Sequence, residues 1–100
     1  MYVHLPYTRF VIFDWDDRKE EENIKKHGVD FWEAQTVFFD PLAKQFADAH
    51  PTHERFILIG HSARPQFLLV VFAEKHGEEI RIISARKPTA KERQKYEEGI

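Results

Sequence analysis

The sequence of 100 residues contains no cysteine and only four glycines. The lack of thiols excludes a disulfide framework, a thiolate zinc site and a cysteine nucleophile, and it fits a reducing compartment such as the cytoplasm. With so few glycines, no glycine-rich loop is present that would cradle a nucleotide phosphate, so any phosphate site has to use side chains. No apolar run approaches the ~20 residues that cross a bilayer, so we expect no membrane contact.

Hydrophobic residues are nevertheless plentiful, at 42% of the chain with nine phenylalanines, which is enough for a folded core. A length of 100 residues predicts one domain over residues 1–100. Residues 1–50 hold six Lys and Arg against ten Asp and Glu, whereas residues 81–96 hold six against one. Such a basic end can bind a phosphate backbone, although a solvated helix face has the same composition.

Hydrophobic periodicity and turn signals divide the chain into strands and helices. Helices grouped at the two ends of a run of hairpin-linked strands indicate an α+β fold with an antiparallel sheet, in the order β-α-α-β-β-β-β-α. The expected elements are strand 9–13, helix 17–27, helix 29–41, strands 42–48, 55–61, 66–74 and 79–86, and a last helix that begins at 88–92.

The helix ends carry recognisable capping residues. Asp14 or Asp16 can cap helix 17–27, and Gly28 is suited to end it. Asp30 with Glu33 has the spacing of a capping box, as has a Thr-x-x-Glu at the start of the last helix. Within helix 17–27, Ile24 is nearly the only apolar residue, so this helix is expected on the surface with one narrow apolar contact.

The six histidines raise the question of a metal site. His50 and His53 are three positions apart with Pro51 between them, which places them in a turn and not on one helix face. No carboxylate completes a recognisable ligand set around them. The sequence therefore predicts neither a metal site nor another cofactor.

His27 follows two lysines at the end of the first helix. One interpretation is electrostatic: positive charge there complements the helix dipole. The other is chemical, since an imidazole beside Lys26 can exchange protons near neutral pH. The sequence alone is compatible with either role for His27.

Arginines cluster near the predicted strands. In strand 79–86, alternation places Ser84 and Arg86 on one face, with Ile80 and Ile82, and places Arg81 on the other face. Arg55 opens a neighbouring strand and Arg64 lies in the turn after it. Guanidinium groups bind phosphate well, but these arginines would equally form ion pairs with Glu54, Glu79 or Glu92.

Several short motifs, taken in order, resemble the BrnT family of type II toxins. They are Asp14-Trp15-Asp16, then Asn23 with KHGV over 26–29, then Glu54-Arg55, and RIISAR over 81–86 followed by Glu92-Arg93 and Tyr96. The resemblance extends from Phe13 to Glu98, although the loop at 48–54 is shorter than in many relatives. It implies a RelE/ParE-like fold and a ribonuclease that cleaves RNA and inhibits translation. It also implies a BrnA-like antitoxin, a complex of two toxins with two antitoxins, and binding of operator DNA through the antitoxin.

The resemblance also suggests roles for the residues already singled out. RNA supplies its own nucleophile, the 2′-OH, so the protein needs an acid, a base and cations, and no metal. The expected catalytic residues are Lys26 and His27 for proton transfer and Arg55, Arg81 and Arg86 as cations, with Glu54 (the reserve base), Ser84 and Arg64 contacting the RNA.

The alternative is a module without catalytic activity that acts through protein or DNA contacts. The basic cluster on neighbouring strands favours the enzyme. A stand-alone transcription factor is disfavoured because the sequence has no helix-turn-helix or ribbon–helix–helix pattern with a basic reading element.

Overall fold

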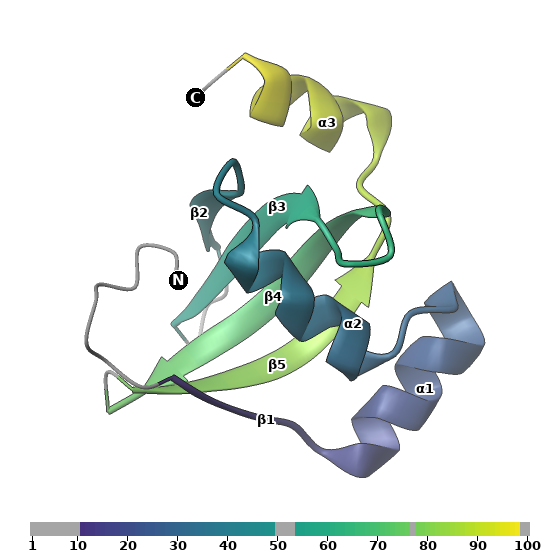
Figure 1. The fold of residues 1–100 in the computed structure, drawn as a ribbon, viewed down its shortest axis with the longest axis vertical. Helices are drawn as coiled ribbons and strands as arrows, with labels where there is room; N and C mark the ends of the chain where they lie inside the picture. The colour runs from purple at the N-terminus through teal and green to yellow at the C-terminus, as the bar shows by residue number, and fades with distance from the viewer. Residues whose placement is uncertain (1–10, 50–53, 77, 99–100) are drawn as a thin grey trace.

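The computed structural model describes residues 11–49, 54–76 and 78–98, which form a five-stranded sheet with helices at its edge and on both faces (Figure 1). The element order agrees with the predicted β-α-α-β-β-β-β-α. The helices are α1 (Asp17–His27), α2 (Phe31–Thr36), the 3₁₀ helix η1 (Val37–Phe39) and α3 (Ala90–Glu97). The strands are β1 (Ile12–Asp14), β2 (Lys44–Asp48), β3 (Arg55–His61), β4 (Phe67–Lys75) and β5 (Glu79–Arg86).

The sheet is mixed, so the prediction of an antiparallel sheet is confirmed for four of its strands and wrong for β1. Its strand order is β1-β5-β4-β3-β2, and the consecutive strands from β2 to β5 pair antiparallel as expected. β1 pairs parallel with β5, and Asp14 lies opposite Arg81. Hairpin signals report only on strands that follow one another in the chain. The first and the last strand meet through a long connection, so local patterns do not fix their relative direction.

One face of the sheet is covered by α2 and η1 (Figure 1). The ring of Phe38 packs edge-on against Phe72, with 4.9 Å between the centroids. Each buried side chain of this size stabilises the fold by about 1.5–3 kcal/mol, so this face supplies most of the core. Its other fully or nearly fully buried members include Phe31, Ala34, Val37, Leu58, Leu68, Val70, Ile82 and Ala85.

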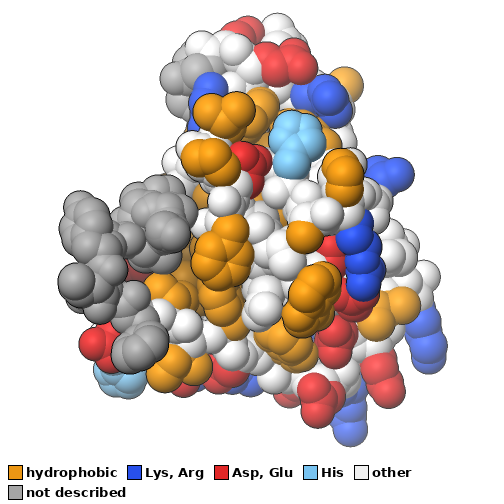
Figure 2. All heavy atoms as spheres, in the orientation of Figure 1, with side chains coloured by type: hydrophobic (Ala, Val, Ile, Leu, Met, Phe, Trp, Pro, Cys, Tyr) orange, Lys and Arg blue, Asp and Glu red, His pale blue; other side chains and the backbone are white. Residues whose placement is uncertain are grey.

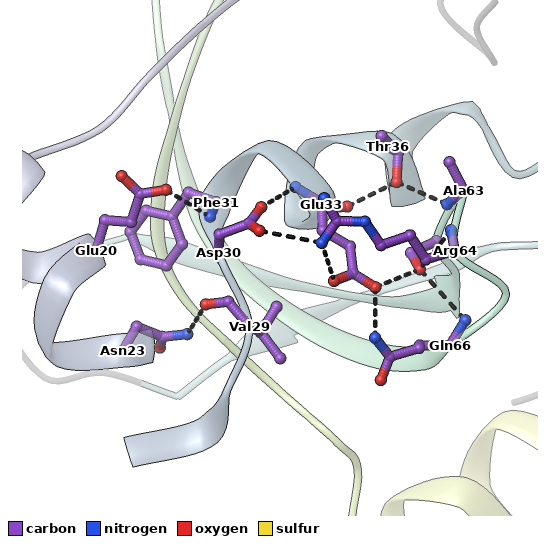
Figure 3. Close-up of polar contacts among 11 residues, drawn as sticks. Glu20, Asn23, Val29, Asp30, Phe31, Glu33, Thr36, Ala63, Arg64 and Gln66 are labelled. Carbon is purple, nitrogen blue, oxygen red and sulfur yellow. Dashed lines mark hydrogen bonds and ion pairs between the residues drawn. The ribbon is translucent and has the colours of Figure 1, made fainter. Parts of the chain in front are cut away.

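The second helix is shorter than the predicted 29–41, because it changes to the 3₁₀ form after Thr36. Asp30 caps it as predicted, accepting a hydrogen bond from the Glu33 backbone N–H at 2.7 Å. The side chain of Glu33 does not complete a capping box. It is buried and accepts hydrogen bonds from Ser62 Oγ at 2.7 Å and Gln66 Nε2 at 2.9 Å (Figure 3). The turn between β3 and β4 is thereby fastened to α2.

The helix α1 has the predicted bounds, with Asp16 as its N-cap and Gly28 in the left-handed region at φ 72° as its C-cap. It lies beside the part of β5 that extends past β1 (Figure 1). The expected apolar contact was wrong, because Ile24 is 45% exposed. The buried residue is Asn23, whose Nδ2 donates to the Ala85 carbonyl at 2.8 Å and whose Oδ1 accepts from the Ala85 N–H at 3.1 Å. A side-chain amide thus occupies the place of a neighbouring strand.

The helix α3 packs on the opposite face of the sheet, near one end. The Tyr96 ring lies edge-on to Phe67 at 4.9 Å, and Lys44 Nζ donates to the Tyr96 carbonyl at 2.7 Å. A smaller cluster around the buried Ile59, Leu69 and Val71 forms this face. Among the described helices, none combines the length and the apolar character that crossing a membrane requires.

Candidate active site

A bulge in β5 decides which of its side chains share a face. Phe72 of β4 lies opposite Ile82, but Val71 lies opposite Ser84, so Ile83 is an additional residue. The bulge shifts the alternation of β5 by one residue. Arg81, Ser84 and Arg86 therefore lie on the same face, and the prediction that Arg81 lies opposite the other two was wrong. Their partners on β4 are Ala73, Val71 and Leu69.

Arg55 belongs to this face as well. It alternates in phase with Ile57 and Ile59, which pack in the cluster under α3. Arg55 Nη2 lies 3.0 Å from Asp48 Oδ2, and Arg81 Nη1 lies 3.0 Å from Asp14 Oδ2. We call the surface formed by Arg55, Arg81, Ser84 and Arg86 the basic face.

Arg55 and Arg81 of the basic face stand in one row across the sheet. β3 and β5 are separated by β4, so their backbones lie ~10 Å apart. Ala73 of β4 lies opposite Arg81 and carries only a methyl group, and the β3–β4 register continued past Phe56 and Phe72 brings Arg55 level with Ala73. The row consists of Asp14, Arg81, Ala73, Arg55 and Asp48.

Arg86 is held from α3 by a two-pronged ion pair. Its Nη1 and Nη2 lie 2.8 Å and 2.9 Å from the two carboxylate oxygens of Glu92. The hydrogen bonds from Arg86 lower the pKa of Glu92 from 4.5 to about 2, and Glu92 in turn raises the pKa of Arg86. Glu92 also completes the predicted capping box with Thr89. The carboxylate of Glu92 thus caps the N-terminus of α3 and also fixes the orientation of the Arg86 guanidinium group.

A groove of about 200 Å³ lies between α1 and β5. It brings Lys26 and His27, from the end of α1, together with Ser84, which is distant in sequence. Lys19 stands two helical turns before Lys26 and faces the same groove. Asn23 lines it too, and its bonds to β5 hold α1 in this register. The lining residues are Lys19, Glu22, Asn23, Lys26, His27, Ile83 and Ser84.

Two predicted contact residues, Arg64 and Glu54, do not line this groove. Arg64 is on the α2 side, where its Nη1 lies 3.1 Å from Asp30 Oδ2 and 3.3 Å from Glu33 Oε1 (Figure 3). The structure therefore does not bring Arg64 together with the basic face. Glu54 is exposed and directly precedes Arg55, at the beginning of β3.

The histidines considered as metal ligands, His50 and His53, lie outside the described residues. Within residues 11–49, 54–76 and 78–98, no three histidine, aspartate or glutamate side chains are grouped as a metal site would require.

Some residues of the site were missed by sequence reasoning. Lys19 had a usable signal, since a spacing of seven from Lys26 places both on one side of a helix. Asp14 and Asp48 had none, because their pairing with arginines depends on strand register. Asn23 belongs to the motifs of the family resemblance, but its burial, at 6% exposure, and its bonds to β5 were not predicted.

The basic face retains capacity to bind an anion. The side chains of Arg55, Arg81 and Arg86 are 27%, 35% and 33% exposed. An arginine has five N–H donors, and Arg81 uses one on Asp14. Its remaining donors suit the paired oxygens of a phosphodiester. Lys19 and Lys26 add positive charge at the adjacent groove, so the arrangement favours a polyanionic substrate.

Comparison with known proteins agrees with this chemistry. Residues 15–92 match the model of a family described as the ribonuclease toxin BrnT of type II toxin–antitoxin systems. The chain is similar to the crystal structure of the Brucella abortus ribonuclease toxin BrnT, with a TM-score of 0.59 and 27% sequence identity over 82% of this chain and 99% of that one. No curated protein sequence matches it.

The family model spans most of the chain, from Trp15 at the start of α1 to Glu92 in α3. It therefore includes the groove and all the arginines of the basic face. The chain belongs to the BrnT family of ribonuclease toxins of type II toxin–antitoxin systems.

Proposed function

We propose that this chain is a metal-independent endoribonuclease whose active site is the α1–β5 groove together with the basic face. The observation that carries the proposal is the meeting of Lys26, His27 and Ser84 in one groove of β5, with Arg81 and Arg86 on the same strand face as Ser84. RNA brings its own nucleophile, the 2′-OH, to the adjacent phosphorus. The protein then needs only to move protons and to stabilise negative charge.

His27 and Lys26 are assigned to proton transfer. One accepts the proton of the 2′-OH, and the other donates a proton to the departing 5′ oxygen. Ser84 is placed to hydrogen-bond a phosphate oxygen between them. The products are a 2′,3′-cyclic phosphate and a 5′-hydroxyl, so a water molecule is not consumed in this step.

The arginines are assigned to charge stabilisation. Arg81 and Arg86 flank Ser84 along β5, at about 3.3 Å per residue, within reach of one phosphodiester. Their ion pairs with Asp14 and Glu92 hold the guanidinium groups in a fixed orientation before substrate arrives. Arg55 stands two strands away, so it is assigned to a neighbouring phosphate of the RNA backbone.

The remaining expectations from the family resemblance belong to the same proposal. The fold is RelE/ParE-like, RNA cleavage inhibits translation in the cytoplasm, and a BrnA-like antitoxin neutralises the toxin. The complex contains two copies of each protein, and the antitoxin carries the contact with operator DNA. A type II toxin has an antitoxin protein as its partner, which supports this part of the proposal.

One observation favours the competing function of a module without catalytic activity. Arg55, Arg81 and Arg86 are each in an ion pair, and in a binding module such pairs would be purely structural. The two functions differ in what happens to RNA, so product analysis separates them.

The product test uses purified chain and a synthetic RNA, with EDTA or with Mg²⁺. We expect cleavage in both conditions and a 2′,3′-cyclic phosphate at the new 3′ end, detected by mass spectrometry. An RNA with one 2′-deoxynucleotide at the cleaved position should resist cleavage there. Cleavage that EDTA abolishes and Mg²⁺ restores would contradict the metal-independent mechanism.

Substitutions test the assigned residues. We expect Arg81→Ala to lower kcat/KM by about 10²–10³-fold, the loss typical of removing one preorganised donor. Lys91→Ala removes an exposed cation of α3 and should change the rate less than about threefold, as a surface change typically does. For the groove, Lys26→Ala should reduce cleavage strongly, whereas the adjacent Lys25, which does not line it, should be replaceable by alanine. Equal effects within each pair would show that only net charge matters.

A further inference from the structure

A second groove lies on the α2 side of the molecule and takes no part in the proposed chemistry. It has a volume of about 500 Å³ and lies between α2, η1 and the end of β3. Trp32 and Phe39 line it, at 51% and 57% exposure, and Leu42 follows η1 with 71% exposure. Figure 2 shows orange side chains gathered over α2 and the segment after it. Large exposed apolar side chains grouped in this way are typical of an interaction site.

Apart from His61, which is about half exposed, the polar side chains of this groove are already hydrogen-bonded within the protein. Thr36 Oγ1 donates to the Glu33 carbonyl at 2.6 Å and accepts from the Ala63 N–H at 2.8 Å. Asp40 accepts from the backbone N–H groups of Leu42 and His61 at 3.0 Å and 2.8 Å. A ligand is therefore offered mainly apolar surface, and this favours an apolar segment of a protein over a polar small molecule.

The groove is held in shape before any partner arrives. The guanidinium carbon of Arg64 lies 5.6 Å from the centre of the Trp32 ring, and Arg64 is itself bound by Asp30 and Glu33. Figure 3 shows how these two carboxylates converge on Arg64. A preorganised aromatic anchor loses little conformational entropy when it binds, so it contributes strongly to affinity.

The charges around the groove disfavour RNA here. Asp40 lines the groove, with His61 Nδ1 3.6 Å from its Oδ2. Asp30 and the buried Glu33 lie beside the groove, and both pair with Arg64. Carboxylates therefore outnumber the arginine around the groove. Phosphates would be repelled by the excess of carboxylates, whereas a partner with basic residues beside its apolar ones would be attracted. The basic face lies on the other side of the sheet, so the two surfaces select ligands of opposite charge.

We propose that this groove is the docking site for an amphipathic, base-flanked segment of the cognate antitoxin, with apolar residues seated on Trp32 and Phe39. The inference rests on the proposed function only in requiring an antitoxin partner. The docked segment anchors the antitoxin on the α2 side. The rest of that protein is then free to reach the basic face.

Binding measurements test this proposal with the antitoxin encoded beside this chain as the probe. We expect Trp32→Ala and Phe39→Ser each to weaken antitoxin binding by about 30-fold or more, as for an interface hot spot. The matched control is Ile24→Ala, which removes an apolar side chain of similar exposure from α1 and should change affinity less than about threefold. RNA cleavage by the free variants should equal that of the unmodified chain, which keeps this test separate from the test of catalysis.

A spectroscopic readout locates the contact directly. The chain has two tryptophans, and Trp15→Phe leaves Trp32 as the single reporter while preserving an aromatic ring against Phe31. Antitoxin binding should shift the Trp32 emission to shorter wavelength and reduce its quenching by iodide.

Three results would overturn the proposal. Unchanged antitoxin affinity in both variants, with unshifted Trp32 emission, would place the antitoxin elsewhere. Self-association of the chain that Trp32→Ala abolishes would make a second copy the occupant. A raised KM for RNA in Trp32→Ala, with antitoxin binding intact, would assign the groove to RNA. An RNA that is never cleaved would refute the proposed function but leave the binding result readable.

Discussion

Ile82 and Ile83 are adjacent in β5, yet they belong to different regions of the molecule. Ile82 is 1% exposed in the core under α2. Ile83 is half-buried beside the groove that holds Lys26, His27 and Ser84. The face of the sheet under α2 and η1, called the packed face here, consists of buried aromatic and aliphatic side chains. The basic face, on the other side, presents arginines. Most of the buried core and the arginines of the basic face therefore lie on opposite sides of one sheet.

The basic face is maintained by a different kind of interaction from the packed face. Each of its arginines has a carboxylate from another element: Asp48, Asp14 and Glu92. Half-exposed ion pairs contribute little stability, roughly 0–1 kcal/mol each. Their main effect is on geometry, because they direct the guanidinium groups. Substitutions on this face should therefore affect RNA cleavage more than folding.

The largest expected effect is a difference in the free energy of unfolding between substitutions of Ile82 and Ile83. Ile82→Ala should lower the free energy of unfolding by about 3 kcal/mol, because it removes a core side chain and leaves a cavity. Ile83→Ala should lower it by about 1 kcal/mol, since part of this side chain already contacts water. Urea unfolding followed by tryptophan fluorescence measures both. Equal losses would show that the basic face is packed as tightly as the core.

An intermediate effect is expected at Asn23, which joins α1 to β5. Asn23→Ala leaves the N–H and C=O of Ala85 without their partner and should destabilise the protein by about 2 kcal/mol. Amide hydrogen exchange at Ala85 should become faster, and RNA cleavage should fall because Lys26 and His27 lose their register on Ser84.

The adjacent Ile24→Ala is the control, because its exposed side chain should contribute less than about 0.5 kcal/mol. If Ile24→Ala were the more destabilising of the two, the apolar contact predicted from sequence would be the real one. The polar edge contact would then be secondary.

The smallest expected effect concerns acid stability. Because the folded state lowers the pKa of Glu92 from 4.5 to about 2, this residue stabilises the fold above pH 4.5 and loses its contribution as the pH falls toward 2. At a side chain about one-third exposed, solvent screening leaves roughly 1 kcal/mol. Glu92→Gln should lower the free energy of unfolding by that amount at neutral pH and by almost nothing near pH 2. A constant difference between pH 2 and pH 6 would contradict this coupling.

Local signals were sufficient for most element boundaries. The helix over 17–27 and the strands over 55–61 and 79–86 have the predicted limits. Asp16, Gly28 and the Thr89–Glu92 pair cap the helices as their spacing indicates. These features depend on residues within one turn of each other, so a short stretch of sequence contains all the relevant interactions.

Predictions that required knowledge of distant neighbours were less successful. The bulge at Ile83 reversed the predicted face of Arg81, because a single additional residue changes the alternation of every later side chain. Arg64 was grouped with the other arginines by composition, but it lies beside Asp30 and Glu33 on the α2 side. Glu33 was expected at a helix end and is instead a buried acceptor for the β3–β4 turn.

The amino-acid sequence by itself determined the order of the helices and strands, the ends of several of them, the presence of an apolar core, and the kind of side chain available for phosphate chemistry. Tertiary structure alone decided that Lys26 and His27 meet Ser84, that β1 runs parallel to β5, and that the exposed Trp32 shares an apolar groove with Phe39. The physical reason is the sequence separation between the residues that interact. Capping and periodicity act between residues a few positions apart, whereas each of these contacts depends on strand register and helix docking across the whole chain.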